Sequence, residues 1–214
     1  MDITYLGHSS FKIKGKTTSL VTDPFDSSVG FKYPKVSADI ITVSHDHGDH
    51  NNTDQVTGAR KIISGPGEYE IAGVSIVGFK TFHDDKKGKL RGKNTVYMIE
   101  IDGFRLVHMG DLGHKLSQRI IEMLGDVDVV MIPVGGEYTI DHGKAVSVVQ
   151  DIQPSIVIPM HYQVKGLDQK VFSKLTGSDE FVKDLGLSVE KLDKLSIKTG
   201  SVLIDQKIVI LQRK

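Results

Sequence analysis

The feature that most constrains this chain is the run from Ser44 to His50, which packs three histidines and two aspartates into seven residues. It directly follows the apolar, strand-like run from Ala38 to Val43. Imidazole and carboxylate groups together suit zinc and neighbouring divalent transition ions. A strand that ends in such a cluster delivers its ligands to a rim that solvent and a substrate can reach. The sequence therefore predicts a metal site, against the alternative of a polar surface turn rich in histidine.

Length and composition set broad limits on the chain. Its 214 residues are predicted to form a single domain spanning residues 1–214. Lysine plus arginine equals aspartate plus glutamate, at 27 each, so no overall field favours nucleic acid or an anionic membrane. The chain contains no cysteine, which excludes thiolate ligands. It shows neither a signal-peptide pattern nor a long apolar stretch, so we expect a cytoplasmic protein outside the membrane.

Short runs rich in Val, Ile, Thr and aromatic residues predict many strands, with helices among the later ones. The predicted strands are 3–6, 11–13, 19–22, 40–43, 61–63, 74–79, 95–101, 105–108, 127–133, 156–159, 202–204 and 208–211. We expect the last two to form a hairpin. The predicted helices run from 117 to 124 and from 141 or 142 to 152, with further helix inside 172–185, broken near 176–178. This order allows two sheets packed face to face with helices outside.

Ligand-type residues recur at the ends of other predicted strands. On a regular strand His45 and His47 point to the same side and can bind one ion, whereas Asp49 and His50 follow the turn at Gly48 and can serve a second. Three further residues each come directly after an apolar run, namely His83, Asp111 and His161. If the tips of these strands converge on one rim, their side chains complete the metal site.

The pattern His45-x-His47-x-Asp49-His50, with Asp23 before it and His83, Asp111 and His161 after it, resembles the metallo-β-lactamase superfamily over residues 3 to 165. The stretches Leu6 to Phe11 and Pro133 to Gly136 further resemble its small bacterial and archaeal branch of metal-dependent hydrolases, related to the ascorbate-6-phosphate lactonases. The resemblance implies an α+β fold, a four-layer αββα sandwich with a two-metal site at one edge of the sheets.

The resemblance also implies a role for each of these side chains. It predicts two divalent ions, with zinc favoured and manganese or iron as alternatives. The first ion would be held by His45, His47 and His83, the second by Asp49, His50 and His161, with Asp111 bridging both. Asp49 and Asp111 are the predicted catalytic carboxylates, Asp49 as an acceptor or donor of a proton. Asp23 is expected behind the ligands, where it orients imidazoles, and His8 beside or beneath the site.

A basic stretch follows His83. Five lysines and arginines fall between Asp84 and Asn94, and a loop leaving a metal ligand can overhang the pocket and attract an anion. A solvated hairpin loop is the alternative. We take Arg91, Asn94 and His114 as candidate substrate contacts.

These features favour a metal-dependent hydrolase that activates water against a small anionic ester, lactone or phosphodiester. A nuclease of the same superfamily is one alternative, although the neutral chain shows no large basic footprint. A non-hydrolytic metal-binding or redox protein is the other, although all seven expected ligand positions are occupied. The expected partner is therefore a small molecule rather than nucleic acid, and the segment after Leu167 could support a homo-oligomer.

Overall fold

Two β-sheets form the centre of the molecule in the computed structural model, which describes residues 1–203 and 205–214. The strands of the first sheet are β1 (Asp2–Gly7), β2 (Ser10–Lys14), β3 (Ser19–Thr22), β5 (Ile40–Val43), β7 (Lys61–Ser64) and β15 (Leu195–Ser196). Their order across the sheet is β15-β1-β2-β3-β5-β7. A separate small pair joins β4 (Val36–Ser37) to β6 (Val56–Thr57).

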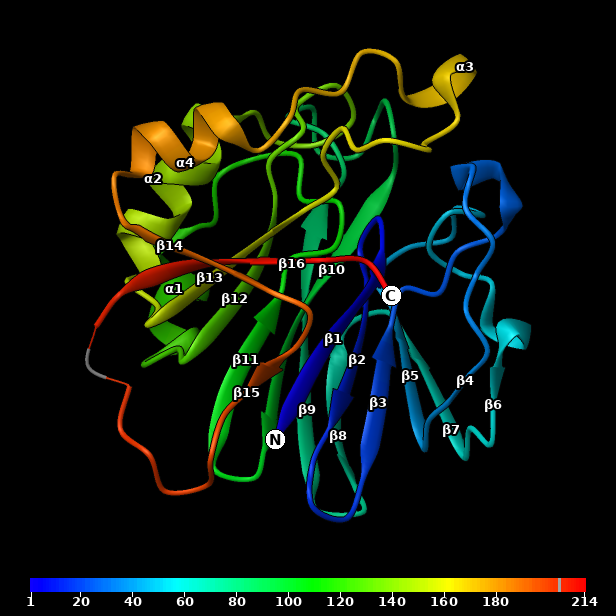
Figure 1. The fold of residues 1–214 in the computed structure, drawn as a ribbon, viewed down its shortest axis with the longest axis vertical. Coiled ribbons are helices and arrows are strands. Elements are labelled where there is room, and N and C mark those ends of the chain that lie inside the picture. Colours follow the sequence, from blue (N-terminus) through cyan, green and yellow to red (C-terminus); the bar gives the residue numbers. More distant parts are fainter. Residues whose placement is uncertain (204) are drawn as a thin grey trace.

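The second sheet is larger and mixed in strand direction. Its strands are β8 (Gly67–Ile71), β9 (Val74–Phe82), β10 (Lys93–Ile101), β11 (Phe104–His108), β12 (Val129–Pro133), β13 (Ile156–Met160), β14 (Ser188–Leu192) and β16 (Lys207–Leu211). Their order is β14-β16-β13-β12-β11-β10-β9-β8. The two sheets lie face to face in Figure 1, and their inner faces share one apolar core. Within that core Tyr97 is fully buried and donates its hydroxyl proton to the carbonyl of Val43 in the opposite sheet, at 2.9 Å.

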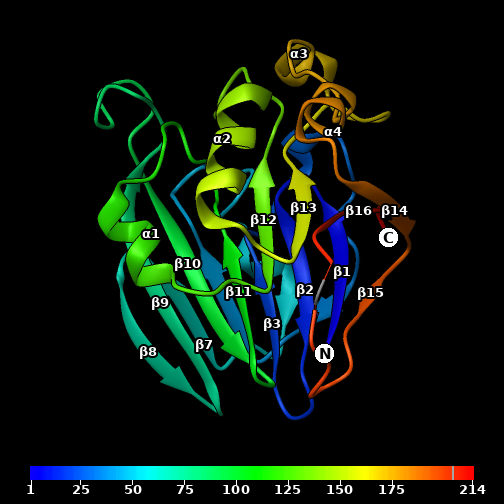
Figure 2. The same cartoon turned by 90° about the vertical axis from the view of Figure 1, so that its left-hand side faces the viewer.

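Helices cover the outer face of the second sheet. These are α1 (Gln118–Leu124), α2 (His142–Ile152) and α4 (Asp179–Leu185), and Figure 2 shows α1 and α2 in front of the strands. The side chain of Asp141 caps α2 by accepting the amide proton of Lys144. Apolar residues of α2 at helical spacing, among them Ala145, Val149 and Ile152, are buried against the sheet.

The outer face of the first sheet carries a thinner layer. It consists of loops with the short helices η1 (Ser27–Val29), η2 (Thr53–Gln55) and α3 (Gln169–Phe172). Phe25, Phe31 and Phe172 pack there against Val21 and Ile41 of the sheet. The predicted α+β sandwich of the metallo-β-lactamase type is confirmed, with its fourth layer reduced largely to loops.

The chain end departs from the sequence-based expectation. Position 204 of the predicted strand 202–204 lies outside the described residues, and residues 202 and 203 belong to no strand. Instead of closing a hairpin, β16 pairs in parallel with β13 and β14. The predicted hairpin is therefore wrong over the part of the chain that the structure describes, because β16 is wholly accommodated inside the second sheet.

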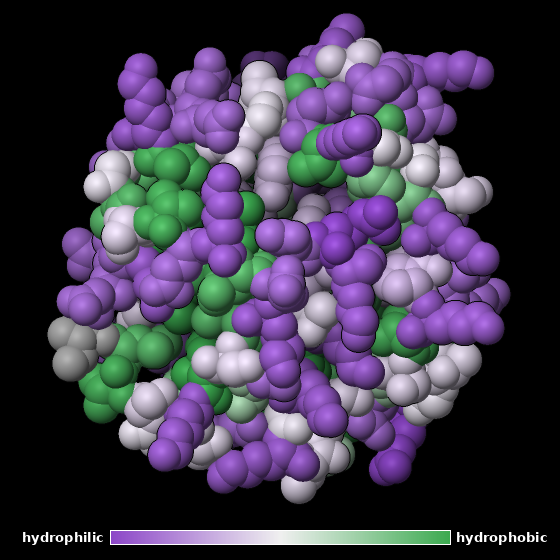
Figure 3. Space-filling model, in the orientation of Figure 1, coloured by the Kyte–Doolittle hydropathy of each residue, from purple (hydrophilic) through white to green (hydrophobic). Residues whose placement is uncertain are grey.

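The surface of the described residues is mostly polar. Figure 3 shows hydrophilic side chains over most of one face, with apolar side chains gathered mainly on its left-hand side. The large apolar side chains that are exposed lie on separate elements, namely Ile62, Leu90, Met123, Val171, Val189 and Val202. Among the described helices, none combines the length and the apolar character needed to span a bilayer.

Candidate metal centre

The predicted ligands come together at one edge of the sandwich, from both sheets. The segment after β5 supplies His45, His47, Asp49 and His50 from the first sheet. The second sheet supplies the other three, each just beyond a strand: His83 after β9, Asp111 after β11 and His161 after β13. Because the C-terminal ends of β5, β9, β11 and β13 face the same edge, side chains distant in sequence share one site.

The ligand atoms form two clusters. His45, His47 and His83 bring ring nitrogens within 4.8 Å of one another. A second cluster, of four residues whose ligand atoms meet the same limit, joins His8, Asp49, His50 and His161. Asp111 lies between them. Its Oδ2 is 3.3 Å from Nε2 of both His50 and His83, and 3.2 Å from Nε2 of His161. A carboxylate so placed can contact a cation in either cluster.

Several of these atoms have no hydrogen-bond partner among the described residues. The Nε2 atoms of His45, His50 and His161 and the Oδ1 atom of Asp111 are all buried and unsatisfied. A buried polar atom without a partner costs about 1–3 kcal/mol. Neutral imidazole nitrogens and carboxylate oxygens aimed at a common centre are the donor set that a divalent ion satisfies. The residues present therefore fit a bound metal.

One buried carboxylate orients ligands of both clusters. Asp23, with no solvent exposure, accepts the Nδ1 proton of His50 at 2.8 Å and the hydroxyl proton of Ser44 at 2.5 Å. The Ser44 oxygen in turn contacts Nδ1 of His45 at 2.9 Å. Such contacts fix the tautomer of each ring and leave its Nε2 lone pair for a metal. Asp23 thus reaches these two rings, directly or through Ser44, from the side opposite their Nε2 atoms, and its role as an orienting residue stays a prediction.

His8 lies in the second cluster. Its Nε2 atom is 3.1 Å from Oδ2 of Asp49, and its ring packs on that of His161 with the centroids 4.2 Å apart. The backbone of His8 has φ of 55°, and Asp23 and His161 have φ of 40° and 50°. A left-handed backbone conformation costs conformational energy in residues other than glycine, and residues in this conformation concentrate at functional sites.

Burial and mutual charge shift the pKa values of the cluster in opposite directions. Burial lowers the pKa of His8 to about 4 and that of His45 to about 3, with His161 and His50 as further causes. Burial by itself raises the pKa of Asp111, but His161 and His50 outweigh it and hold that pKa well below its usual range. His8 and His45 are thus neutral near pH 7 and Asp111 is ionised, the states in which each can ligate a metal.

The candidate substrate contacts have different surroundings. Arg91 lies at the rim, where Nη2 donates to the carbonyl of Glu137 at 3.3 Å and the guanidinium lies 5.5 Å from the Tyr138 ring centroid. Asn94 is buried, and its amide group donates to Thr81 and Met109 and accepts the amide proton of Asp111. Its side chain therefore holds the backbone of Asp111 in place.

The remaining histidines are engaged with the protein itself. His114, the third candidate substrate contact, accepts the amide proton of Phe82 at Nε2 and contacts the carbonyl of Lys115 through Nδ1. These bonds tie it to the end of β9. His108 is fully buried against the carbonyl of Ser9, and His142 contacts Asp184 at the start of α2.

A cavity of about 230 Å³ opens onto the ligands. Besides His47, Asp49, His83, Asp111 and His161 it is lined by Arg91, Tyr138, Val171 and Phe172. The sequence did not single out Tyr138, Val171 or Phe172 as site residues. The one sequence signal near Tyr138 is the glycine-rich loop after β12, which leads into it. Phe172 has no such signal, because in the sequence it is an ordinary apolar residue of a helix.

Comparison with known proteins agrees with this geometry. The β-lactamase superfamily domain matches residues 2–161. The chain belongs to this superfamily. A metal-dependent hydrolase of the UPF0173 group from Pyrococcus furiosus is 30% identical over 207 residues, covering 82% of this chain and 92% of the relative. A second, from Thermococcus onnurineus, is 29% identical over 233 residues, covering 94% and 98%. The relation to ascorbate-6-phosphate lactonases stays a prediction.

Solved structures support the same assignment. A Thermotoga maritima protein described as a Zn-dependent hydrolase of the metallo-β-lactamase superfamily has 33% identity and a TM-score of 0.80 and covers 100% of this chain and 99% of its own. A metallo hydrolase from Ignicoccus hospitalis, at 22% identity and a TM-score of 0.68 over 86% of this chain and 90% of its own, shares the fold. The superfamily member described here is thus a metal-dependent hydrolase.

Proposed function

We propose that this superfamily member binds two divalent ions and hydrolyses a small anionic ester, lactone or phosphodiester. The observation that carries the proposal is the pair of ligand clusters, His45, His47 and His83 on one side and Asp49, His50 and His161 on the other, with Asp111 between them. Zinc is the ion we favour, with manganese and iron as alternatives, because all three accept imidazole and carboxylate ligands.

A bound pair of divalent ions supplies water activated for attack at neutral pH and stabilises the negative charge of the transition state. The side chains of the protein do the rest. Asp111 contacts both clusters and keeps them at a fixed separation. Asp49 is partly exposed to the cavity, with His8 at its Oδ2 atom, and is placed to take a proton from a water there.

The rim of the cavity favours an anionic substrate. Arg91 faces the same cavity as the ligands, and stacking near Tyr138 holds its guanidinium in place. Val171 and Phe172 add apolar surface to the lining of this cavity. A substrate with a small apolar part beside a charged group fits these walls, and the modest volume favours a small molecule over a polymer.

Metal analysis combined with turnover tests the proposal. Wild type should contain about two ions per chain and hydrolyse members of an ester, lactone and phosphodiester panel. The variant His47→Ala should contain less metal, and its kcat/KM should be at least about 100-fold lower than that of wild type. It removes a predicted ligand that is exposed, so the packing of the core is unchanged. His142→Ala, which removes a histidine at the start of α2, is the matched control and should keep both.

Asp111→Asn tests the bridge separately, because it removes the charge and keeps the shape. We expect fewer than two ions per chain. Two ions with undiminished turnover in this variant would refute the bridging role. Full metal content without turnover on any member of the panel would instead favour a non-hydrolytic metal protein.

A further inference from the structure

A second and larger hollow runs away from the ligands, on the other side of His45 and His47. It encloses about 660 Å³ and continues from the metal centre along the edge where the two sheets meet. Its walls include Ser64 to Pro66, Lys80, Arg91 and Lys93, and we call it the lysine groove. His47 and Arg91 line both this groove and the smaller cavity, so the two hollows flank one centre.

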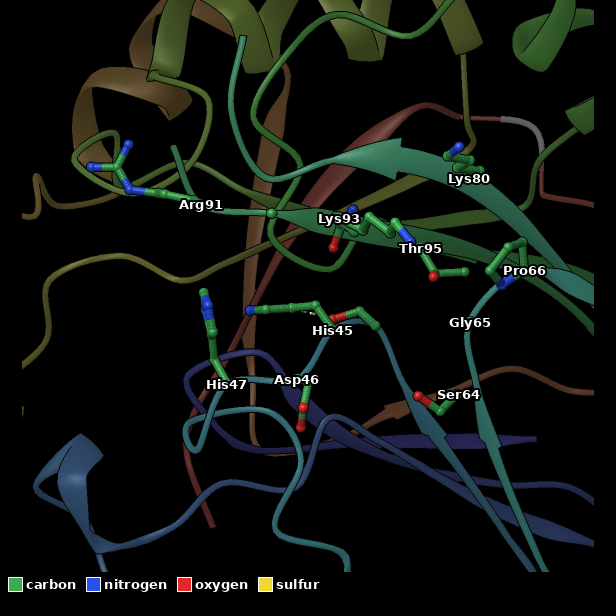
Figure 4. A pocket seen from close by; sticks show the side chains of 13 residues that line it. His45, Asp46, His47, Ser64, Gly65, Pro66, Lys80, Arg91, Lys93 and Thr95 are labelled. Atoms are coloured by element: carbon green, nitrogen blue, oxygen red, sulfur yellow. Dashed lines mark hydrogen bonds between the residues drawn. The ribbon is translucent and has the colours of Figure 1, made fainter. Parts of the chain in front are cut away.

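The lysines share one face of the second sheet. β9 and β10 pair in antiparallel register, with Lys80 opposite Thr95 and Lys93 opposite Phe82. Lys80 and Lys93 are therefore diagonal neighbours, about 7–8 Å apart at the backbone, and their long side chains reach the same space. Figure 4 shows Arg91, Lys93 and Lys80 along one side of the groove.

The charge of these lysines is not balanced within the groove. Both side chains are exposed, and among the described residues neither lies within 4.0 Å of a carboxylate oxygen. The one carboxylate in the lining, Asp46, accepts a hydrogen bond from the Asn51 side chain. Like charges on neighbouring side chains repel each other, and an anion bound between them would relieve that repulsion.

The opposite wall leaves room for such a ligand. Ser64 and Pro66 are exposed, and a Cβ atom built on Gly65 would meet nothing within 4 Å. The backbone of this wall is held in place, since the hydroxyl oxygen of Tyr97 accepts the amide proton of Gly65 at 2.9 Å. An open hollow lined by three cationic side chains and one carboxylate has an excess of positive charge, which suits it to an anion.

We infer that the lysine groove is the subsite for the far end of the substrate, and that it takes an oxyanion, either phosphate or carboxylate, held by Lys80 and Lys93. The inference rests on the proposed function, because it places the scissile bond at the metal centre between the two hollows. The substrate is then an extended molecule whose anionic group lies beyond His47, with its other end against Tyr138 and Phe172. Lysine ammonium groups are suited to this as strong point charges.

Binding can be measured without turnover. Inorganic phosphate and, separately, acetate are titrated into ¹⁵N-labelled, metal-loaded protein at low ionic strength. The backbone amides of Gly65, Lys80 and Thr95 should shift and saturate with at least one of the two anions, and the anion that acts identifies the group. The double variant Lys80→Gln/Lys93→Gln should lose these shifts. Lys86→Gln/Lys89→Gln removes the same charge from exposed positions outside the groove and should keep them.

Two esters that share a leaving group provide the kinetic readout. In wild type, kcat/KM for 4-nitrophenyl hemisuccinate should be roughly tenfold higher than kcat/KM for the neutral 4-nitrophenyl acetate. In Lys80→Gln/Lys93→Gln the ratio of the two values should fall to about one. The Lys86→Gln/Lys89→Gln ratio should match wild type.

The outcomes separate the two claims. Hydrolysis with an unchanged ratio in the lysine variant, or no shift of the groove amides with either anion, would overturn the inference and leave the proposed function standing. Saturable, lysine-dependent anion binding in a protein that hydrolyses no member of the ester, lactone and phosphodiester panel would refute the proposed function and leave the anion site standing.

Discussion

Asp23 shows how much of the metal centre depends on a residue that has no ligand role. It is fully buried, yet it reaches His50 directly and His45 through Ser44, so one carboxylate orients one imidazole in each cluster. Burial by itself raises the pKa of Asp23, but His108 and His50 outweigh it and keep the carboxylate ionised. The same side chain also accepts the amide proton of Ser44 and thereby sets the backbone where β5 ends.

Replacing Asp23 by Asn should weaken both metal positions. The amide keeps the shape but offers one acceptor atom where the carboxylate offers two. If its nitrogen takes the place of Oδ2, His50 and the Ser44 hydroxyl both lose their acceptor, and if it takes the place of Oδ1, the Ser44 backbone amide loses its own. We expect metal affinity to fall by about 10–100-fold and the free energy of unfolding by about 1–3 kcal/mol. Chelator competition and urea unfolding measure the two effects.

Asp39→Asn is the matched control for this experiment. Asp39 likewise accepts both the amide and the hydroxyl proton of a serine, Ser19, but it lies at the other end of β5. It should leave metal affinity unchanged. If Asp23→Asn binds zinc as tightly as this control does, the positioning role is refuted.

The loop between β9 and β10 is ordered by one aspartate. Asp84 accepts four backbone amide protons, from Lys86, Gly88, Leu90 and Arg91. Burial by itself raises the pKa of Asp84, but these four bonds lower it to about 2, so the carboxylate stays charged over the whole physiological range. The loop is therefore held in one shape, which points Arg91 at the rim of the metal centre.

Asp84→Asn should loosen this loop and misplace Arg91. An asparagine cannot accept from all four amides, so hydrogen exchange over residues 86–91 should speed up. For an anionic substrate KM should rise several-fold with a smaller change in kcat, because the role proposed for Arg91 is to bind the substrate and not to react with it. Asp85→Asn removes the same charge from the exposed neighbour and should change neither quantity. Equal exchange rates in the two variants would show that Asp84 does not order the loop.

The elements predicted from sequence were those with a strong apolar signal. Strands such as β5 and β13 are buried on both faces, so their residues are almost all aliphatic. The edge strand β14 was missed because most of its residues are exposed and polar, as in Glu190 and Lys191. The predicted hairpin failed because the sequence of β16 does not specify which neighbour it pairs with.

The same reasoning explains which site residues the sequence suggested. Ligand-type residues stand directly behind strong strands, so His83, Asp111 and His161 could be picked out one by one. Lys80 stands inside a strand, and only the register of β9 against β10 brings it beside Lys93. Asn94 and His114 were chosen for their closeness to ligands in sequence, but their hydrogen bonds to backbone groups are tertiary contacts that no spacing reveals.

At the scale of the whole molecule, the metal centre joins the two sheets. Its ligands come from the end of β5 in the first sheet and from β9, β11 and β13 in the second. A ligand that binds only the folded state stabilises it, by about 2.7 kcal/mol at a free concentration of one hundred times Kd. Metal should therefore raise the resistance of the entire sandwich to unfolding. Without metal, the buried rings of His8 and His45 are left as neutral groups that resist protonation, because burial lowers the pKa of both.

Because these rings resist protonation, the free energy of unfolding of the metal-free protein should depend on pH. The pKa of His8 is about 4 when folded, mainly because of burial, against about 6.5 in an unfolded chain. Between these values the unfolded state binds more protons, so stability falls as the pH drops from about 6.5 to 4, by up to about 1.4 kcal/mol per pH unit from this residue. His8→Asn removes the titrating group, and asparagine tolerates the φ of 55° at this position. In urea unfolding of EDTA-treated protein, the free energy of unfolding should fall less steeply with decreasing pH in the variant than in wild type over this range. Parallel plots of this free energy against pH would mean that His8 takes up its proton as readily when folded as when unfolded.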